Sequence, residues 1–239
     1  MTKNIVSKID DSVKINTVLV SVSDKSGLES FIPALVEINP EIRILSTGGT
    51  FSTISRILDE FSKGSGADIL KNRKSSHKIL EQVSDYTGQP ETQGGLVKTL
   101  DFRIYLGLLT ETYNESHQND LKRTNSIAID MVVVNLYPFK ETISKPDATC
   151  ENARGNIDIG GPTMIRASAK NFIRAASVVD PSDYAEILEN MRSSDGALNL
   201  EQRFNLAKKA FEHTAVYDRT IADYLANTPF EKVKSCYSI

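Results

Sequence analysis

Several features that mark other classes of protein are missing from this 239-residue chain. It has no tryptophan, and its only cysteines, Cys150 and Cys236, show neither CxxC nor Cys/His spacing, so no metal site or disulfide framework is indicated. No segment approaches the ~18 apolar residues of a membrane helix, and the N-terminus lacks the apolar core of a signal peptide. We therefore predict a cytoplasmic protein that neither spans nor binds a membrane.

A strong excess of charge of one sign is also missing. The 28 Lys and Arg residues and 31 Asp and Glu residues leave a formal net charge of -3, which does not favour nucleic acid as a partner. Any affinity for an anion must therefore be local. The chain is long enough to bury a substantial core.

The pattern of apolar residues predicts strands alternating with helices. Short runs rich in β-branched residues predict strands at residues 17–23, 42–46, 131–136 and 175–179. Helical spacing predicts helices at residues 28–36, capped by Ser26, at 51–61, and in a long segment from 201 onward. This alternation predicts an α/β fold with an open, mainly parallel sheet of about five strands and helical additions at the C-terminus.

Two segments are harder to assign. Residues 62–78 are rich in Gly, Ser and basic residues and predict an exposed, mobile loop. In the long C-terminal helix, one apolar face indicates either core or a subunit contact, and it is formed by Phe204, Ala207, Phe211, Ala215, Ala222 and Leu225.

Polar residues follow the predicted strands where they end, and ligands bind at that edge of an open α/β sheet. They are Ser23, Asp24 and Lys25 after the first strand, Thr47, Gly48, Gly49 and Thr50 after the second, and Asn135 and Tyr137 after the third. The TGGT segment leads into a helix whose N–H groups suit a phosphate, and a nearby lysine would neutralise its charge. By itself, however, a double-glycine turn is common, and a lysine near a helix start is commonly solvated.

The segment NIDIGGPTMIRASAKN at residues 156–171 gathers further charged groups around a helix start. Gly160 and Gly161 permit a sharp turn or close approach to a ligand. Arg166 and Lys170 lie one turn apart on one helix face, with Asp158 before the helix, which suits an anionic, proton-transferring site. The alternative is a glycine turn into a core helix with two solvated cations.

Lys98 and Tyr137 are weaker candidates. Lys98 follows a double glycine at residues 94–95, and a phenol beside a lysine can exchange protons. The plain alternatives are a surface turn and an aromatic residue at a strand end.

Eight motifs occur in an order and spacing that resemble a known family. They are SVSDKSG, STGGT, VSDYTGQPE, GGLVKTL, VVVNLYPF, NIDIGGPTMIRASAKN, VVDPSDY and AFEHTAVYD, between about residues 18 and 225. They resemble the IMP cyclohydrolase part of the bifunctional purine-biosynthesis protein, whose other part is an AICAR formyltransferase. The resemblance implies a methylglyoxal-synthase-like fold, ring closure of FAICAR to inosine monophosphate with loss of water, no metal or organic cofactor, and a homodimer.

The resemblance also assigns roles. Lys170 and Asp158 would shuttle protons, and Lys98 with Tyr137 would stabilise the oxyanion of the tetrahedral intermediate. The predicted substrate-binding residues are Ser23, Asp24, Lys25, Thr47, Gly48, Gly49, Thr50, Thr99, Asn135, Ile159, Gly160, Gly161 and Arg166.

Some positions depart from the family. Leu96 replaces an arginine, and Asp101 and Tyr105 replace histidines, so any role of those side chains is lost. Arg103 is a candidate substitute anion contact. We expect one domain at residues 15–226 with terminal tails at 1–14 and 227–239, and, because no room is left for it, a formyltransferase on a separate polypeptide.

Two other functions share the implied fold. A nucleotide-sensing regulatory module would need the phosphate contacts and not the proton-transfer set. A methylglyoxal synthase would need a carboxylate base for a triose phosphate. The joint presence of Lys98, Tyr137, Asp158 and Lys170 favours the cyclohydrolase.

Overall fold

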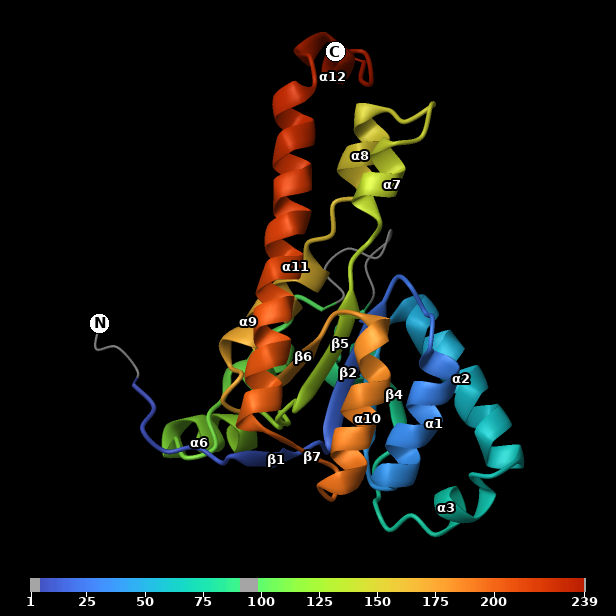
Figure 1. Cartoon of the computed structure of the whole chain (residues 1–239), viewed down its shortest axis with the longest axis vertical. Coiled ribbons are helices and arrows are strands. Elements are labelled where there is room, and N and C mark those ends of the chain that lie inside the picture. Colours follow the sequence, from blue (N-terminus) through green and yellow to red (C-terminus); the bar gives the residue numbers. More distant parts are fainter. Residues whose placement is uncertain (1–4, 91–98, 239) are drawn as a thin grey trace.

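A five-stranded parallel sheet forms the centre of the molecule (Figure 1), in a computed structural model that describes residues 5–90 and 99–238. The strand order is β4-β3-β2-β5-β6, and the strands are β2 (Thr17–Val22), β3 (Arg43–Ser46), β4 (Leu80–Gln82), β5 (Met131–Asn135) and β6 (Ala176–Val178). The middle strands β2 and β5 are almost wholly buried, as expected for a parallel sheet covered on both faces. The predicted α/β class and parallel sheet are confirmed.

Helices cover both faces of the sheet. One face carries α1 (Leu28–Ile38), α2 (Gly48–Lys63) and α10 (Tyr184–Ser193), and the other carries α5 (Phe102–Leu109), α9 (Gly160–Lys170) and α11 (Leu200–Asn227). Alternate residues of β2 point to opposite faces of the sheet. Val18 and Val20 pack in the apolar cluster under α1, α2 and α10, and Leu19 packs in the cluster under α5, α9 and α11. Both faces of the sheet are therefore core.

Shorter elements complete the fold, and two lie in the segments predicted to be tails. They are β1 (Ser12–Lys14), β7 (Ala197–Asn199), α3 (Ala67–Lys71), α4 (Val83–Thr87), α6 (Glu115–Arg123), α7 (Phe139–Ile143), α8 (Cys150–Gly155), α12 (Phe230–Lys234) and a 3-10 helix (Pro181–Asp183). β1 pairs antiparallel with β7. One strand of the predicted N-terminal tail is therefore paired with a strand of the predicted domain.

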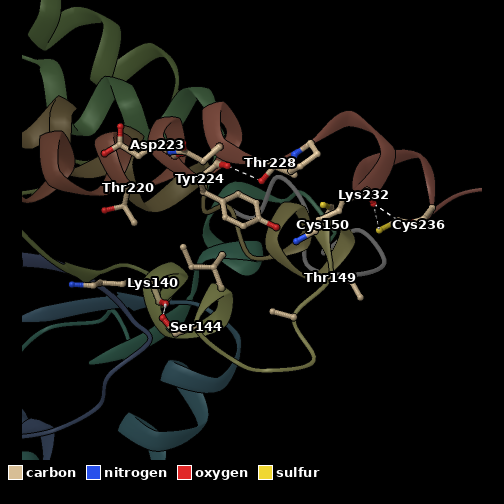
Figure 2. Close-up of a pocket in the computed structure, with 15 residues that line it drawn as sticks. Lys140, Ser144, Thr149, Cys150, Thr220, Asp223, Tyr224, Thr228, Lys232 and Cys236 are labelled. Carbon is tan, nitrogen blue, oxygen red and sulfur yellow. Dashed lines mark hydrogen bonds between the residues drawn. The ribbon is translucent and has the colours of Figure 1, made fainter.

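Beyond the sheet, α11 continues alongside α7 and α8 and ends near α12. A cavity of about 760 Å³ lies among these helices (Figure 2). Both cysteines line it, and the Tyr224 hydroxyl points toward Cys150.

Residues 62–78 are not simply a loop, contrary to the sequence prediction. They contain α3, and the Arg73 guanidinium donates hydrogen bonds to the backbone carbonyls of Pro40, Ile42 and His77. The segment is thereby attached to the turn that precedes β3. The predicted Ser26 cap is also wrong, because Gly27 occupies that position with a left-handed backbone (φ 78°).

The buried face of α11 differs from the predicted apolar face. Phe204 and Leu225 are 45% and 58% exposed, and the fully buried positions are Arg203, Ala207, Ala210 and Thr214. The pattern of apolar residues does not reveal this buried face, because its first residue is Arg203. That guanidinium donates to five backbone carbonyls, those of Asp10, Asp11, Phe172, Ile173 and Leu198.

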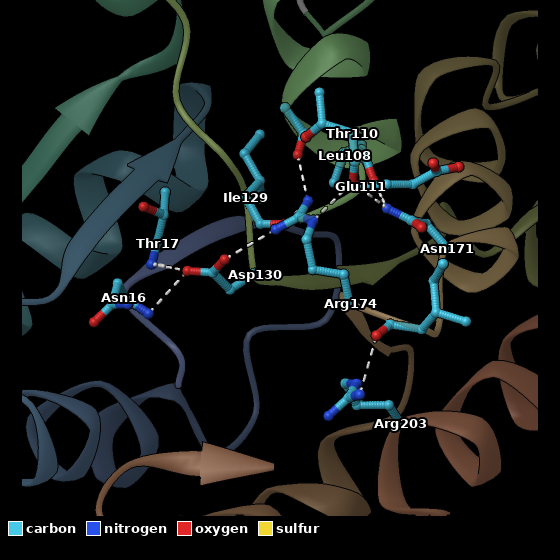
Figure 3. Close-up of polar contacts among 12 residues, drawn as sticks. Asn16, Thr17, Leu108, Thr110, Glu111, Ile129, Asp130, Asn171, Arg174 and Arg203 are labelled. Atoms are coloured by element: carbon cyan, nitrogen blue, oxygen red, sulfur yellow. Dashed lines mark hydrogen bonds and ion pairs between the residues drawn. The ribbon is translucent and has the colours of Figure 1, made fainter. Parts of the chain in front are cut away.

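A second buried arginine, Arg174, lies at the N-terminal ends of the sheet strands (Figure 3). Arg174 and Asp130 form an ion pair at 3.0 Å, and the carboxylate of Asp130 also accepts the N–H groups of Asn16 and Thr17 at 2.9 Å. Buried charges need such complete pairing. The network connects the N-terminal ends of β2, β5 and β6, at the edge of the sheet opposite the carboxyl ends of these strands.

Candidate active site

A cavity of about 460 Å³ opens where β2, β3 and β5 end and where α2 and α9 begin. Most of the predicted site residues line it: Ser23, Lys25, Thr47, Gly48, Gly49, Thr50, Thr99, Asn135, Tyr137, Asp158, Ile159, Gly160 and Gly161. They come from five separate stretches of sequence. The convergence expected at the carboxyl edge of the sheet is therefore present.

The N-terminus of α2 forms one wall of this cavity. The TGGT segment is the first turn of the helix rather than a loop, and Gly48 has a positive φ of 43°, which favours glycine. The hydroxyls of Thr47 and Ser21 lie 2.9 Å apart, and the Thr50 hydroxyl donates to the Val22 carbonyl at 3.0 Å. The first N–H groups of a helix have no partner within it, so this end suits an anion.

Asn135 organises the loop after β2. Its side-chain oxygen accepts the N–H groups of Ser23 and Asp24 at 2.7 and 2.8 Å, and its side-chain nitrogen donates to the Asp24 carbonyl at 2.8 Å. The Asp24 carboxylate turns to Ser26, whose hydrogen bonds lower the pKa of Asp24. Lys25 donates to the Ser23 carbonyl at 3.3 Å and contributes a positive charge to the cavity wall.

The N-terminus of α9 forms the opposite wall and carries a carboxylate. Asp158 accepts the N–H of Gly161 at 2.8 Å. Burial raises the pKa of Asp158 above its usual range, although the N–H groups of Gly161 and Tyr137 oppose that rise. A carboxyl group in this setting exchanges a proton more readily near neutral pH than an ordinary aspartate.

Both glycines at the start of α9 stand in crowded positions. A Cβ on Gly161 would lie 2.6 Å from the Asp158 carboxylate and 2.6 Å from Leu136, and a Cβ on Gly160 would lie 2.5 Å from the Thr99 hydroxyl. Only glycine fits such close approaches. The two residues therefore bring the helix against the carboxylate and against Thr99.

Two predicted residues on α9 lie outside the cavity. Arg166 and Lys170 are exposed, and Arg166 lies over the Phe211 ring at 5.5 Å. Lys170 is the last residue of α9, about 15 Å along the helix from Gly160 at 1.5 Å per residue. The predicted convergence of Lys170 with Asp158 is therefore wrong within one subunit, because the helix runs away from the cavity.

Other candidates have different outcomes. Lys98 and Leu96 lie outside the described residues. Arg103 is not a free anion contact, because its guanidinium donates to the carbonyls of Tyr86 and Asn125.

Two tyrosines near Asp158 were missed. The Tyr217 hydroxyl accepts the backbone N–H of Asp158 at 2.8 Å. Burial raises the pKa of Tyr105 to about 12, although the nearby Thr163 side chain opposes that rise, and the charge of Asp158 adds a smaller contribution. Tyr217 continues the buried spacing of α11 through Ala210 and Thr214, a signal that the sequence contained.

Comparison with known proteins first identifies the class. Residues 69–163 match the family of MGS-like domains, and residues 168–238 match the AICARFT/IMPCHase bienzyme family. The crystal structure of ForH superposes with a TM-score of 0.67 at 27% identity, covering 88% of this chain and 96% of that one. The methylglyoxal-synthase-like fold is thus confirmed.

The particular relatives share one name. The bifunctional purine biosynthesis protein PurH of Bacillus subtilis (strain 168) is 42% identical over 94% of this chain, and that of Streptococcus mutans serotype c is 46% identical over 86%. This chain is a homologue of part of PurH, and it spans 40% and 36% of the length of those two relatives. The resemblance expected from the motifs is therefore confirmed.

Among the described residues, no helix is long and apolar enough to cross a membrane. No group of three or more His, Cys, Asp or Glu side chains in that part of the chain is arranged to hold a metal ion.

Proposed function

We propose that this chain is an IMP cyclohydrolase, which closes the second purine ring by converting FAICAR to inosine monophosphate and water. The observation that carries the proposal is one cavity with a helix N-terminus suited to an anion on one wall and, on the other, a half-buried carboxylate whose pKa is raised. The homology to PurH supports the same activity.

The phosphate of the ribonucleotide is assigned to the N-terminus of α2. There Gly48 and Gly49 form the first turn of the helix and line the cavity together with Thr47 and Lys25. The heterocycle then extends toward Asp158, Tyr137 and the start of α9. This orientation keeps the negative phosphate away from the carboxylate.

The chemistry requires the movement of protons and the positioning of two groups. The carboxamide nitrogen attacks the formyl carbon, and a C–N bond and a tetrahedral intermediate form. The carboxamide nitrogen and the formamido nitrogen then each give up one proton, the C–O bond breaks, the C=N bond of the new ring forms, and the formyl oxygen leaves as water with both protons. Asp158 is assigned to proton transfer, and Tyr137 to stabilising the oxyanion. Lys98 shares the oxyanion role in this proposal. Holding the attacking and attacked groups together contributes much of the rate enhancement, since the reaction is intramolecular.

The direct test is to incubate the purified protein with FAICAR and follow inosine monophosphate by chromatography, with Asp158→Asn as the control. Formation of inosine monophosphate by the wild type alone supports the proposal. Binding of nucleotide without turnover would instead establish the regulatory module.

The proposal extends to assembly and location. A homodimer is proposed because α11 exposes Phe204, Phe211, Val216 and Leu225. A purine nucleotide is the small-molecule partner, an AICAR formyltransferase supplies the substrate, and the reaction takes place in the cytoplasm. Sedimentation analysis tests the dimer.

A further inference from the structure

The loop that carries Asp158 is held by a residue from outside the MGS-like segment. The Tyr217 hydroxyl, on α11, accepts the N–H of Asp158 at 2.8 Å and donates to the carbonyl of Asn156 at 3.3 Å. These two hydrogen bonds bracket residue 157 from both sides. Asn156, Ile157 and Asp158 all line the candidate active site.

Tyr217 is itself fixed in place. Its ring meets the Phe139 ring edge to face, with centroids 6.3 Å apart and an interplanar angle of 70°. α11 packs along α9, the helix that Asp158 precedes. The phenol is therefore held between the start of the proposed catalytic helix and the segment that follows β5.

The chemistry of the Tyr217 hydroxyl excludes a role as acid or base in the reaction. Its single proton is used toward Asn156, and a lone pair is used toward Asp158. Burial raises the pKa of Tyr217, so the phenol stays protonated at neutral pH.

We infer that Tyr217 is a positioning residue that sets the backbone at residues 156–158 and thereby aims the Asp158 carboxylate at the substrate. The inference rests on the proposed function. The carboxylate itself is contacted by the backbone N–H groups of Gly161 and Tyr137, so its position depends on these contacts and on the backbone that Tyr217 holds. A shift of ~1 Å in a reacting group costs up to about 100-fold in rate.

Tyr224 provides a matched control on the same helix. Its ring also meets Phe139 edge to face, at 5.7 Å and 87°. Its hydroxyl, however, lies in the larger distal cavity beside Cys150. In the described part of the chain, no hydrogen bond joins it to residues 156–158.

The experiment compares Tyr217→Phe with Tyr224→Phe in the full chain, measuring kcat and KM for FAICAR from pH 5 to 9. We expect Tyr217→Phe to lower kcat between about 10-fold and 100-fold, to change KM less than about threefold, and to shift the acidic limb of the kcat profile. Tyr224→Phe should leave all three within about twofold. A wild-type kcat and pH profile in Tyr217→Phe, or equal losses in both variants, would overturn the inference.

A second readout does not depend on activity. The carboxyl ¹³C resonance of Asp158, identified by its loss in Asp158→Asn, is titrated in the wild type and both variants, with melting temperatures as folding controls. A changed midpoint in Tyr217→Phe alone supports the inference, and an unchanged midpoint overturns it. If the wild type forms no inosine monophosphate, the proposed function fails, and this titration still decides the role of Tyr217.

Discussion

The two helices that begin at the candidate active site start alike, yet the structure gives them opposite electrostatic environments. Each of α2 and α9 begins with a pair of glycines that line the cavity. Before α2 stands Thr47, which makes no side-chain cap hydrogen bond in the described structure, whereas before α9 stands Asp158, whose carboxylate accepts the Gly161 N–H. A side chain within two residues of each helix start thus decides between an end open to a phosphate and an end already supplied with a negative charge.

The comparison also explains why one cavity can serve two tasks. A helix N-terminus attracts negative charge, and at α9 that attraction is directed to the protein's own carboxylate. A phosphate at the same place would be repelled by Asp158. Under the proposed function, charge would therefore orient the nucleotide before any base-specific contact forms.

The largest effect is expected at the acidic end. Asp158→Asn keeps an oxygen that can accept the Gly161 N–H but cannot take up a proton as a carboxylate does. We expect kcat to fall between about 100-fold and 10,000-fold while the affinity for inosine monophosphate, measured by calorimetry, changes less than about threefold. Equal losses in turnover and binding would move Asp158 to a binding role.

The same residue predicts the pH dependence of the wild type. If Asp158 acts in its ionised form, activity falls as the pH drops through its pKa. Because burial raises that pKa, the fall begins at a higher pH than for an exposed aspartate. An acidic limb at the position of an ordinary carboxylate would contradict a buried base.

The next largest effect is expected from adding a methyl group to a glycine at the start of α9, compared with one at the start of α2. In Gly161→Ala the new Cβ would lie 2.6 Å from the Asp158 carboxylate, whereas in Gly49→Ala it would meet nothing within 4 Å. We expect Gly161→Ala to cost about 1–3 kcal/mol of unfolding free energy and at least about 10-fold in kcat. Gly49→Ala serves as the control, and its denaturant midpoint should equal or exceed that of the wild type. A larger loss of stability in Gly49→Ala than in Gly161→Ala would contradict the crowding at Gly161 and the open space at Gly49.

A smaller effect is expected at the anion-binding end. Lys25→Met keeps the length of the side chain and removes its charge. Nucleotide binding should weaken by about 10-fold, the scale of one hydrogen bond to a charged group, with kcat at saturation little changed. The affinity of the variant should also depend less on ionic strength. A loss confined to kcat would place the phosphate elsewhere.

The smallest effect is expected for Lys170→Ala, at the far end of α9. Because Lys170 is exposed and lies outside the cavity, kcat and KM should stay within about twofold of the wild type. A loss comparable to that of Asp158→Asn would mean that Lys170 acts in a site completed by a second subunit.

The sheet and its ligand-binding edge could be predicted because both follow from short-range rules. The β-branched runs at β2 and β5 are almost wholly buried strands, and the carboxyl ends of parallel strands must share one edge. Thr47, Asn135 and Asp158 therefore meet although they are far apart in sequence.

The misplaced residues depended on information that periodicity does not contain. Helical spacing correctly placed Arg166 and Lys170 on one face of α9, but not the direction in which that helix leaves the cavity. On α11, counting apolar residues selected the Phe204 face, because an arginine buried by five carbonyls is invisible to hydrophobicity. The sequence shows that Tyr105 stands where the family has a histidine, but it does not show that the folded chain places Tyr105 near Asp158.

The hydrogen bonds of Arg203 fix the start of α11 and thereby affect residues at the other end of the sheet. Its guanidinium donates to the carbonyls of Asp10, Asp11 and Leu198, so α11 can neither slide nor rotate without breaking several hydrogen bonds at once. Tyr217 is fourteen residues further along this rigid rod, about 21 Å away at 1.5 Å per residue. The axial register of α11 therefore links the residues just before β1 to the backbone of Asp158, and a change at the start of α11 would alter contacts at the opposite edge of the sheet.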